Sequence, residues 1–150
     1  MITSGEWCWG TSFYHIGSHY GFLFFRCPAS FYNRPKKNFK GRCEKRILSK
    51  CERLFKSYDP IQNAYADILE ANPNIDAIHC NVELEGHDYE DYTTDFVCEL
   101  SNGDLMVREC VHRSLLTMPL TMKLLDLSFT YWKNRGVKDW GLVVDEAAEE

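Results

Sequence analysis

The chain has 150 residues, of which 45% are hydrophobic and 14% aromatic, so it is long enough to form one globular domain with its own core. No stretch approaches the roughly 20 apolar residues of a membrane span, and no basic segment followed by an apolar one marks a secretory signal at the N-terminus. The net charge of −5 disfavours a general nucleic-acid binder. Seven cysteines, an odd number without a C-x-x-C pair, favour free buried thiols in a reducing cytoplasm over a disulfide framework.

The charges are distributed unevenly. Residues 34–50 hold eight Lys and Arg and one acid, whereas residues 83–104 hold eight acids and no Lys or Arg. This polarity fits a basic face that contacts phosphates and an acidic cluster that binds a cation. It fits equally well a solvated basic helix start and an acidic rim without a partner, and charge alone does not choose between them.

Residues 1–37 are aromatic and irregular and are expected to form an N-terminal arm or hairpin, and residues 38–150 the main domain. The first predicted helix covers residues 38–58, because apolar residues recur at three-to-four spacing up to Asp59-Pro60. A second, shorter helix is predicted over residues 60–71 and ends before Asn72-Pro73. Its expected apolar face consists of Ile61, Ala64, Tyr65, Ile68 and Leu69.

Three strands are predicted next, over residues 75–84, 92–100 and 105–111, with an Asn-Gly hairpin turn over residues 101–104. A helix over residues 115–135 follows, stopped by Gly136. Residues 140–144 are predicted to form a last buried strand. The expected apolar stripe of the helix consists of Leu116, Leu120, Leu124, Leu127 or Ser128, and Tyr131.

Two acids converge in the predicted hairpin. A turn that pairs Ser101 with Asp104 places Asp95 opposite Cys110 and makes Glu109 its diagonal neighbour, which is within reach after a twist or a one-residue bulge. Two carboxylates from adjacent strands form a hard-oxygen site suited to Mg²⁺ or Mn²⁺. Phosphodiester cleavage uses such a cation to polarise the phosphoryl group and to lower the pKa of the attacking water.

Four segments carry a resemblance to a known family: GRCEKRIL (41–48), YTTDFV (92–97), DLMVREC (104–110) and WGLVVDE (140–146). Together with the element order α-β-β-β-α-β, residues 38–146 resemble the restriction-endonuclease-like PD-(D/E)XK core. Within it, they are similar to the N-terminal catalytic domain of TnsA, the endonuclease subunit of heteromeric transposases. The resemblance implies an α/β fold with a mixed central sheet flanked by helices.

The resemblance also implies roles for individual residues. Glu44 matches the acid on the first helix, Asp95 the central metal ligand and Glu109 the third-strand ligand of Mg²⁺. The family's lysine would fall two residues after Glu109, where Val111 stands, and a valine can neither move a proton nor hold a phosphate. Two replacements are available: Arg113, which comes into place through a shifted register, and Lys123, which reaches back from the following helix.

Each acid also has a purely structural interpretation. Asp95 could cap a turn at the start of its strand, and Glu109 could pair with Arg108 or Arg113. Glu44 could be a helix-surface acid that offsets the basic residues around it. These interpretations predict no metal.

Two functions from different classes follow. The first is an Mg²⁺-dependent DNA endonuclease of a mobile element whose lysine position is degenerate. The second is a nuclease fold without catalysis, encoded by a phage or mobile element, that binds a protein component of a nucleic-acid machine, as an anti-CRISPR-type inhibitor does. Both are expected in the cytoplasm and away from membranes, and a homo-oligomer is left open. The residues expected to contact DNA are Arg34, Lys36, Lys37, Lys40, Arg42, Lys45 and Arg46.

Overall fold

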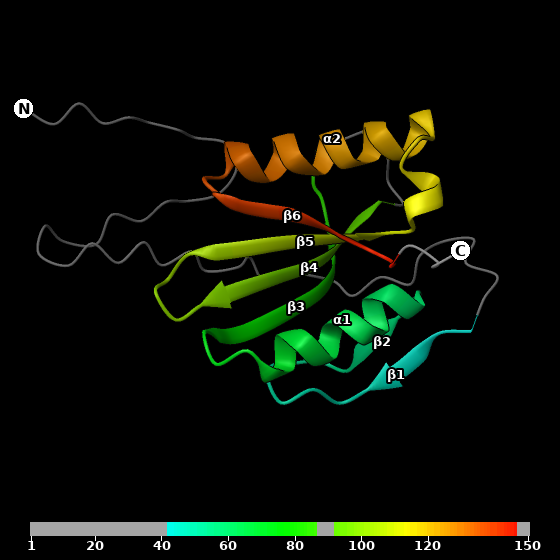
Figure 1. The fold of residues 1–150 in the computed structure, drawn as a ribbon. Coiled ribbons are helices and arrows are strands. Elements are labelled where there is room, and N and C mark those ends of the chain that lie inside the picture. Colours follow the sequence, from blue (N-terminus) through cyan, green and yellow to red (C-terminus); the bar gives the residue numbers. More distant parts are fainter. Residues whose placement is uncertain (1–41, 87–91, 147–150) are drawn as a thin grey trace, which may run out of the picture.

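The computed structural model describes residues 42–86 and 92–146. Within them a mixed four-stranded sheet lies between two helices, with a small two-stranded hairpin beside the first helix (Figure 1). The predicted α/β class and mixed sheet are therefore confirmed. The predicted N-terminal arm lies outside the described residues. Among the described residues, neither helix combines the length and the apolar character that a membrane crossing requires.

Helix α1 (Pro60–Ala71) begins and ends where the sequence predicts. The Asp59 side chain accepts a hydrogen bond from the backbone N–H of Ile61 at 2.7 Å, and Pro60 occupies the first turn, where its missing N–H costs nothing. Asn72 caps the end of the helix, and its backbone N–H donates a hydrogen bond to the carbonyl of Leu69. Its buried face differs from the predicted one and consists of Gln62, Ala66 and Leu69.

The predicted helix over residues 38–58 is wrong in the part that the structure describes. Residues 42–58 instead contain strands β1 (Glu44–Arg46) and β2 (Phe55–Ser57), which pair antiparallel. The apolar spacing misled because Ile47 is 88% exposed, whereas Leu48 and Phe55 point into the core. The two strands are formed by pairing across the intervening residues 47–54, and helix-like spacing of apolar residues does not report such pairing.

The main sheet has the order β3-β4-β5-β6, formed by β3 (Ile75–Glu83), β4 (Thr93–Leu100), β5 (Leu105–Val111) and β6 (Asp139–Val144). The first three strands form an antiparallel meander, of which the β4–β5 hairpin was predicted, and β6 pairs parallel with β5 after the crossover through α2 (Pro119–Asn134). A 3-10 turn, η1 (Arg113–Leu115), precedes that helix.

The turn between β4 and β5 is one residue longer than predicted. Leu100 rather than Ser101 faces Asp104, and the Leu100 N–H donates to the Asp104 carbonyl at 2.9 Å. The loop is closed by Gly103 at φ 87°, a left-handed conformation that glycine adopts without steric cost. The register of the whole hairpin therefore shifts by one residue.

Each face of the sheet has its own core. The α1-side cluster includes Phe55, Leu69, Ile78 and Phe96, and the α2-side cluster includes Val82, Val97, Val107, Trp132 and Val137. Helix α2 buries Leu125, Ser128 and Trp132, so the predicted stripe is displaced, and Leu120 is 56% exposed. Strand β6 is an edge strand with Leu142 and Val144 exposed, so the predicted last buried strand is only half-buried.

Candidate functional site

Asp95 and Glu109 lie opposite each other on neighbouring strands. The β4–β5 ladder pairs Phe96 with Arg108, so the next residues outward are Asp95 and Glu109 themselves. The sequence predicted Cys110 opposite Asp95, which is wrong by the one residue added in the turn. The observed register places the two predicted metal ligands side by side just beyond the last ladder pair, and both are buried, with 6% and 2% of their surfaces exposed.

Glu109 lies inside the α2 side of the molecule and accepts hydrogen bonds at both oxygens. Its Oε2 accepts from the backbone N–H of Asp95 at 3.2 Å, and its Oε1 accepts from the Ser128 hydroxyl. The Ser128 oxygen in turn accepts from the indole N–H of Trp140 at 3.1 Å. Burial, followed by the nearby Asp95 carboxylate, raises the pKa of Glu109 to about 8, although the hydrogen bonds from Ser128 and Thr94 oppose the rise.

The Asp95 side chain likewise accepts a hydrogen bond from the backbone of the neighbouring strand, β5. Its Oδ2 accepts the backbone N–H of Cys110 at 2.8 Å, so each of the two carboxylates binds a main-chain amide of the neighbouring strand. The exchange takes place where the regular β4–β5 ladder ends. The two carboxylates thus take the place of ladder hydrogen bonds where the regular pairing of β4 and β5 stops.

On its other side Asp95 faces Asn81 of β3, since the neighbouring pairs are Cys80 with Phe96 and Val82 with Thr94. Asn81 is fully buried and has a φ of 52°, a left-handed value that an L-residue other than glycine rarely adopts.

Buried amides hold Asn81 in this conformation. Its side-chain amide donates to the carbonyl of Lys56 at 2.8 Å and its oxygen accepts from Gln62 at 3.0 Å. The Gln62 oxygen accepts the backbone N–H of Tyr58 at 3.1 Å. These contacts connect the first turn of α1 to the strand beside Asp95.

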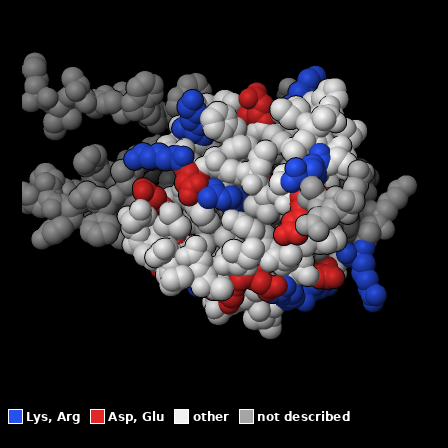
Figure 2. All heavy atoms as spheres, in the orientation of Figure 1, with Lys and Arg blue, Asp and Glu red and all other residues white. Residues whose placement is uncertain are grey.

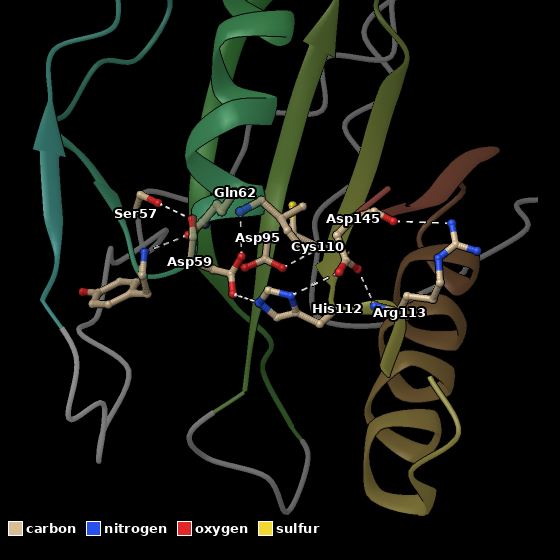
Figure 3. A network of polar contacts seen from close by, with 10 residues as sticks. Ser57, Asp59, Gln62, Asp95, Cys110, His112, Arg113 and Asp145 are labelled. Carbon is tan, nitrogen blue, oxygen red and sulfur yellow. Dashed lines mark hydrogen bonds and ion pairs between the residues drawn. The ribbon is translucent and has the colours of Figure 1, made fainter. Parts of the chain in front are cut away.

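A second titratable group lies at the same end of the sheet (Figure 3). His112 follows β5, and its Nε2 contacts Asp59 Oδ2 at 2.7 Å, while its Nδ1 lies 3.7 Å from Asp145 Oδ2. The backbone N–H of Arg113 donates to Asp145 at 2.5 Å, and this bond is the main cause of the lowered pKa of Asp145. The histidine therefore bridges the start of α1 and the residue after β6, two positions from the Cys110 amide that binds Asp95.

The other predicted catalytic residues lie elsewhere. Glu44 is on strand β1 rather than on a helix; it is exposed and accepts from the Asn63 side chain at 2.6 Å. Arg113 directs its guanidinium to the Asp145 carbonyl at 3.4 Å, on the far side of Asp145 from Asp95 in Figure 3. Lys123 is exposed on α2. Val111, the residue at the lysine position, ends β5 and pairs with Val144.

Of the residues predicted to contact DNA, Arg34, Lys36, Lys37 and Lys40 lie outside the described residues. Arg42 and Lys45 are exposed, whereas Arg46 is engaged by Asp67 and by Asn63. On the face shown in Figure 2, the acidic and basic side chains of the described residues are interspersed rather than separated into patches.

The donor set fits a hard divalent cation. Magnesium is typically held by one or two carboxylates, completed by water and substrate phosphates, and Asp95 and Glu109 are two opposed carboxylates. A cation would also stabilise the ionised form of Glu109, whose pKa is raised by burial and then by the Asp95 carboxylate. Within residues 42–86 and 92–146, no group of three or more His, Cys, Asp or Glu side chains is arranged to bind a metal, so protein ligands alone do not complete a site.

Sequence reasoning missed Asp59, Gln62, Asn81, His112 and Asp145. Only Asp59 carried a signal, because Asp-Pro before an apolar run marks a helix start. Comparison of the sequence with protein-family models and with curated proteins finds no match.

Proposed function

We propose that the chain is a DNA-acting protein with a TnsA-like, restriction-endonuclease-like core, and that Asp95 and Glu109 hold Mg²⁺ for phosphodiester cleavage. The observation that carries the proposal is that these two buried carboxylates each accept a backbone N–H of the other's strand at the end of the β4–β5 ladder. The element order α1, β3, β4, β5, α2, β6 matches the order that the resemblance implies, but with α1 in the place of the helix expected over residues 38–58, whose described part forms strands β1 and β2.

The bound cation would polarise the scissile phosphate and lower the pKa of a water. Asp95 and Glu109 bind it, and their hydrogen bonds to Cys110, Ser128 and the Asp95 backbone hold both side chains in place. Val111 has no ionisable side chain, but the imidazole of the next residue, His112, can carry a proton and is oriented by Asp59 and Asp145. Arg113, which bonds the Asp145 carbonyl, and Lys123, which is exposed on α2, lie away from the two carboxylates, so we assign neither of them a contact with the phosphate.

The test is nicking of supercoiled plasmid by the full chain with Mg²⁺, with Mn²⁺ and with a chelator. The expected result is metal-dependent nicking that falls at least about 100-fold in Asp95→Asn and Glu109→Gln, since both remove a ligand. Asp126→Asn, an exposed acid on α2, is the matched control and is expected to cut like wild type. Absence of cleavage at a large excess of folded protein over plasmid would overturn the proposal.

A second candidate is a nuclease fold that binds without cutting. It is favoured by Val111 at the lysine position and by the internal hydrogen bonds of both carboxylates, which give them a structural role without metal. The partner is then a protein component of a nucleic-acid-processing complex, such as the target of an anti-CRISPR-type inhibitor. Co-migration with that partner unchanged by Asp95→Asn supports this candidate, and plasmid cleavage by wild type argues against it.

A further inference from the structure

Two cysteines from distant parts of the chain have their thiols in contact. Cys51 lies in the irregular segment between β1 and β2, Cys80 lies on β3, and their sulfur atoms are 3.9 Å apart. Both residues are partly buried and neither is in a disulfide. The contact is held by the backbone, because the N–H of Ile78 donates to the carbonyl of Lys50 at 2.9 Å, next to Cys51 and two residues before Cys80.

The remaining distance can be closed locally. A disulfide requires its sulfur atoms to approach to about 2.05 Å. Cys51 belongs to no strand or helix, so rotation of its side chain and a small shift of its segment cost no ladder hydrogen bond. Cys80 keeps its place on β3, paired with Phe96.

We infer that Cys51 and Cys80 form a site of reversible oxidation that closes to a disulfide in the presence of a low-molecular-weight disulfide of the glutathione type. The Cys51 thiol loses its proton to water, and its thiolate attacks one sulfur of the small disulfide, expelling a thiolate and forming a mixed disulfide. Cys80 then loses its proton and attacks the Cys51 sulfur, expelling the second small thiolate. Two protein thiols are oxidised by two electrons, and one small disulfide is reduced to two thiols.

The two thiols are suited to different steps. The hydrogen bond from Cys80 lowers the pKa of Cys51, and the same interaction, with burial, raises the pKa of Cys80. Because Cys51 also lies in an irregular segment whereas Cys80 is held in the ladder of β3, Cys51 is the attacking thiol and Cys80 the resolving one. Cys98, the fully buried neighbour, is unreactive by contrast, because burial raises the pKa of its thiol to about 12.

The experiment incubates the native full-length chain with a series of ratios of oxidised to reduced glutathione, quenches it with an alkylating reagent and maps its peptides by mass spectrometry. The expected product is a Cys51–Cys80 linked peptide that exceeds any other linked pair at least about tenfold and disappears with dithiothreitol. Cys43→Ser, which removes a partly buried thiol outside the pair, should leave the product unchanged.

The single variants separate the two roles. Cys80→Ser should stop at a stable glutathione adduct on Cys51, and Cys51→Ser should give neither the link nor an adduct on Cys80. A wild-type chain that keeps both thiols free under oxidising ratios, links either of them to another cysteine, or stops at the mixed disulfide overturns the inference. The readout is a covalent bond, so it does not depend on nuclease activity.

Discussion

Glu109 is an ionisable side chain that is buried in the core. It is 2% exposed, and an ionised carboxylate is costly at such a position unless it is paired or bound to a metal. The Ser128 hydroxyl and the Asp95 amide supply hydrogen bonds but no positive charge. Without a cation the pKa of the side chain is therefore about 8, and Glu109 keeps its proton at lower pH. A bound divalent cation would take the place of that proton.

The raised pKa makes stability depend on pH in a defined direction. Below its ordinary value near 4.5, Glu109 is protonated in both the folded and the unfolded chain. As pH rises towards 8, the unfolded chain ionises first, so this residue lowers the free energy of unfolding by up to about 1.4 kcal/mol per pH unit. Glu109→Gln removes this loss. We expect the stability of the variant relative to wild type to increase from pH 5 to pH 8 in metal-free urea denaturation.

The control for this series is Asp126→Asn, whose stability relative to wild type should not change over the same window, because Asp126 is exposed. If the curves of Glu109→Gln and wild type run parallel from pH 5 to pH 8, Glu109 does not titrate in this range. Adding Mn²⁺ should stabilise wild type and leave Glu109→Gln less affected, since the variant lacks one carboxylate.

The pairing of Asp95 and Glu109 was predictable from sequence because it depends on one hairpin. The alternating strands and the Asn-Gly turn placed the acids within one residue of their positions, and the error arose because the loop contains the three residues 101–103 rather than the two of an Asn-Gly turn. The positions of Asp59 and His112 were not predictable in this way. Their contact spans 53 residues and depends on how α1 packs against the end of β5.

At the scale of elements, Asp59 has two roles at one helix end. Its Oδ1 caps α1 by accepting from Ile61, and its Oδ2 contacts His112 at 2.7 Å. The helix start is thus joined to the end of β5, the strand that carries Glu109. The two roles belong to different oxygens, so they can be separated by substitution.

We expect Asp59→Ala to lower the free energy of unfolding by about 1–2 kcal/mol, because the cap is lost. Asp59→Asn should cost less, since its amide oxygen can still accept from Ile61. In a double-mutant cycle of Asp59→Asn with His112→Ala, the coupling should stay below about 1 kcal/mol, because both side chains are partly exposed and the ion pair is screened. Urea unfolding at neutral pH measures all four proteins, and equal losses in Asp59→Ala and Asp59→Asn would contradict the capping role.

Elements with local signals were predicted well, and those that depend on distant partners were not. Helix α1 begins at Asp-Pro and ends before Asn-Pro, and strand β5 follows a turn that contains glycine. The bounds of both elements are therefore determined by residues next to them in the sequence. Strands β1 and β2 have three residues each and exist through pairing with one another. The buried face of α1 was displaced because Gln62, a polar residue, occupies a core position. On α2, Ser128 lay on the predicted stripe, but Leu125 and Trp132 are buried rather than their neighbours Leu124 and Tyr131.

At the scale of the molecule, stability should be uneven. Strands β4 and β5 lie in the middle of the sheet with a core on each face, whereas β1 and β2 form a short separate sheet. We expect the amides of β4 to exchange with solvent only through global unfolding and those of β1 and β2 through local opening. Hydrogen exchange at low denaturant measures this. Exchange from β1 and β2 as slow and as denaturant-dependent as that from β4 would contradict it.

The left-handed backbone of Asn81 has a consequence for the sheet as a whole. Alternate residues of a strand normally point to the same face, yet Cys80 packs against the α1-side cluster and Val82 belongs to the α2-side cluster. Across the ladder, Phe96 faces α1 while Thr94 accepts a hydrogen bond from Trp132 of α2. In both strands the regular alternation between the α1 side and the α2 side is interrupted at the same position along the ladder. Asp95 lies at that position, between Thr94 and Phe96. The candidate site therefore lies at the level of the sheet where β3 and β4 change the face on which their side chains pack.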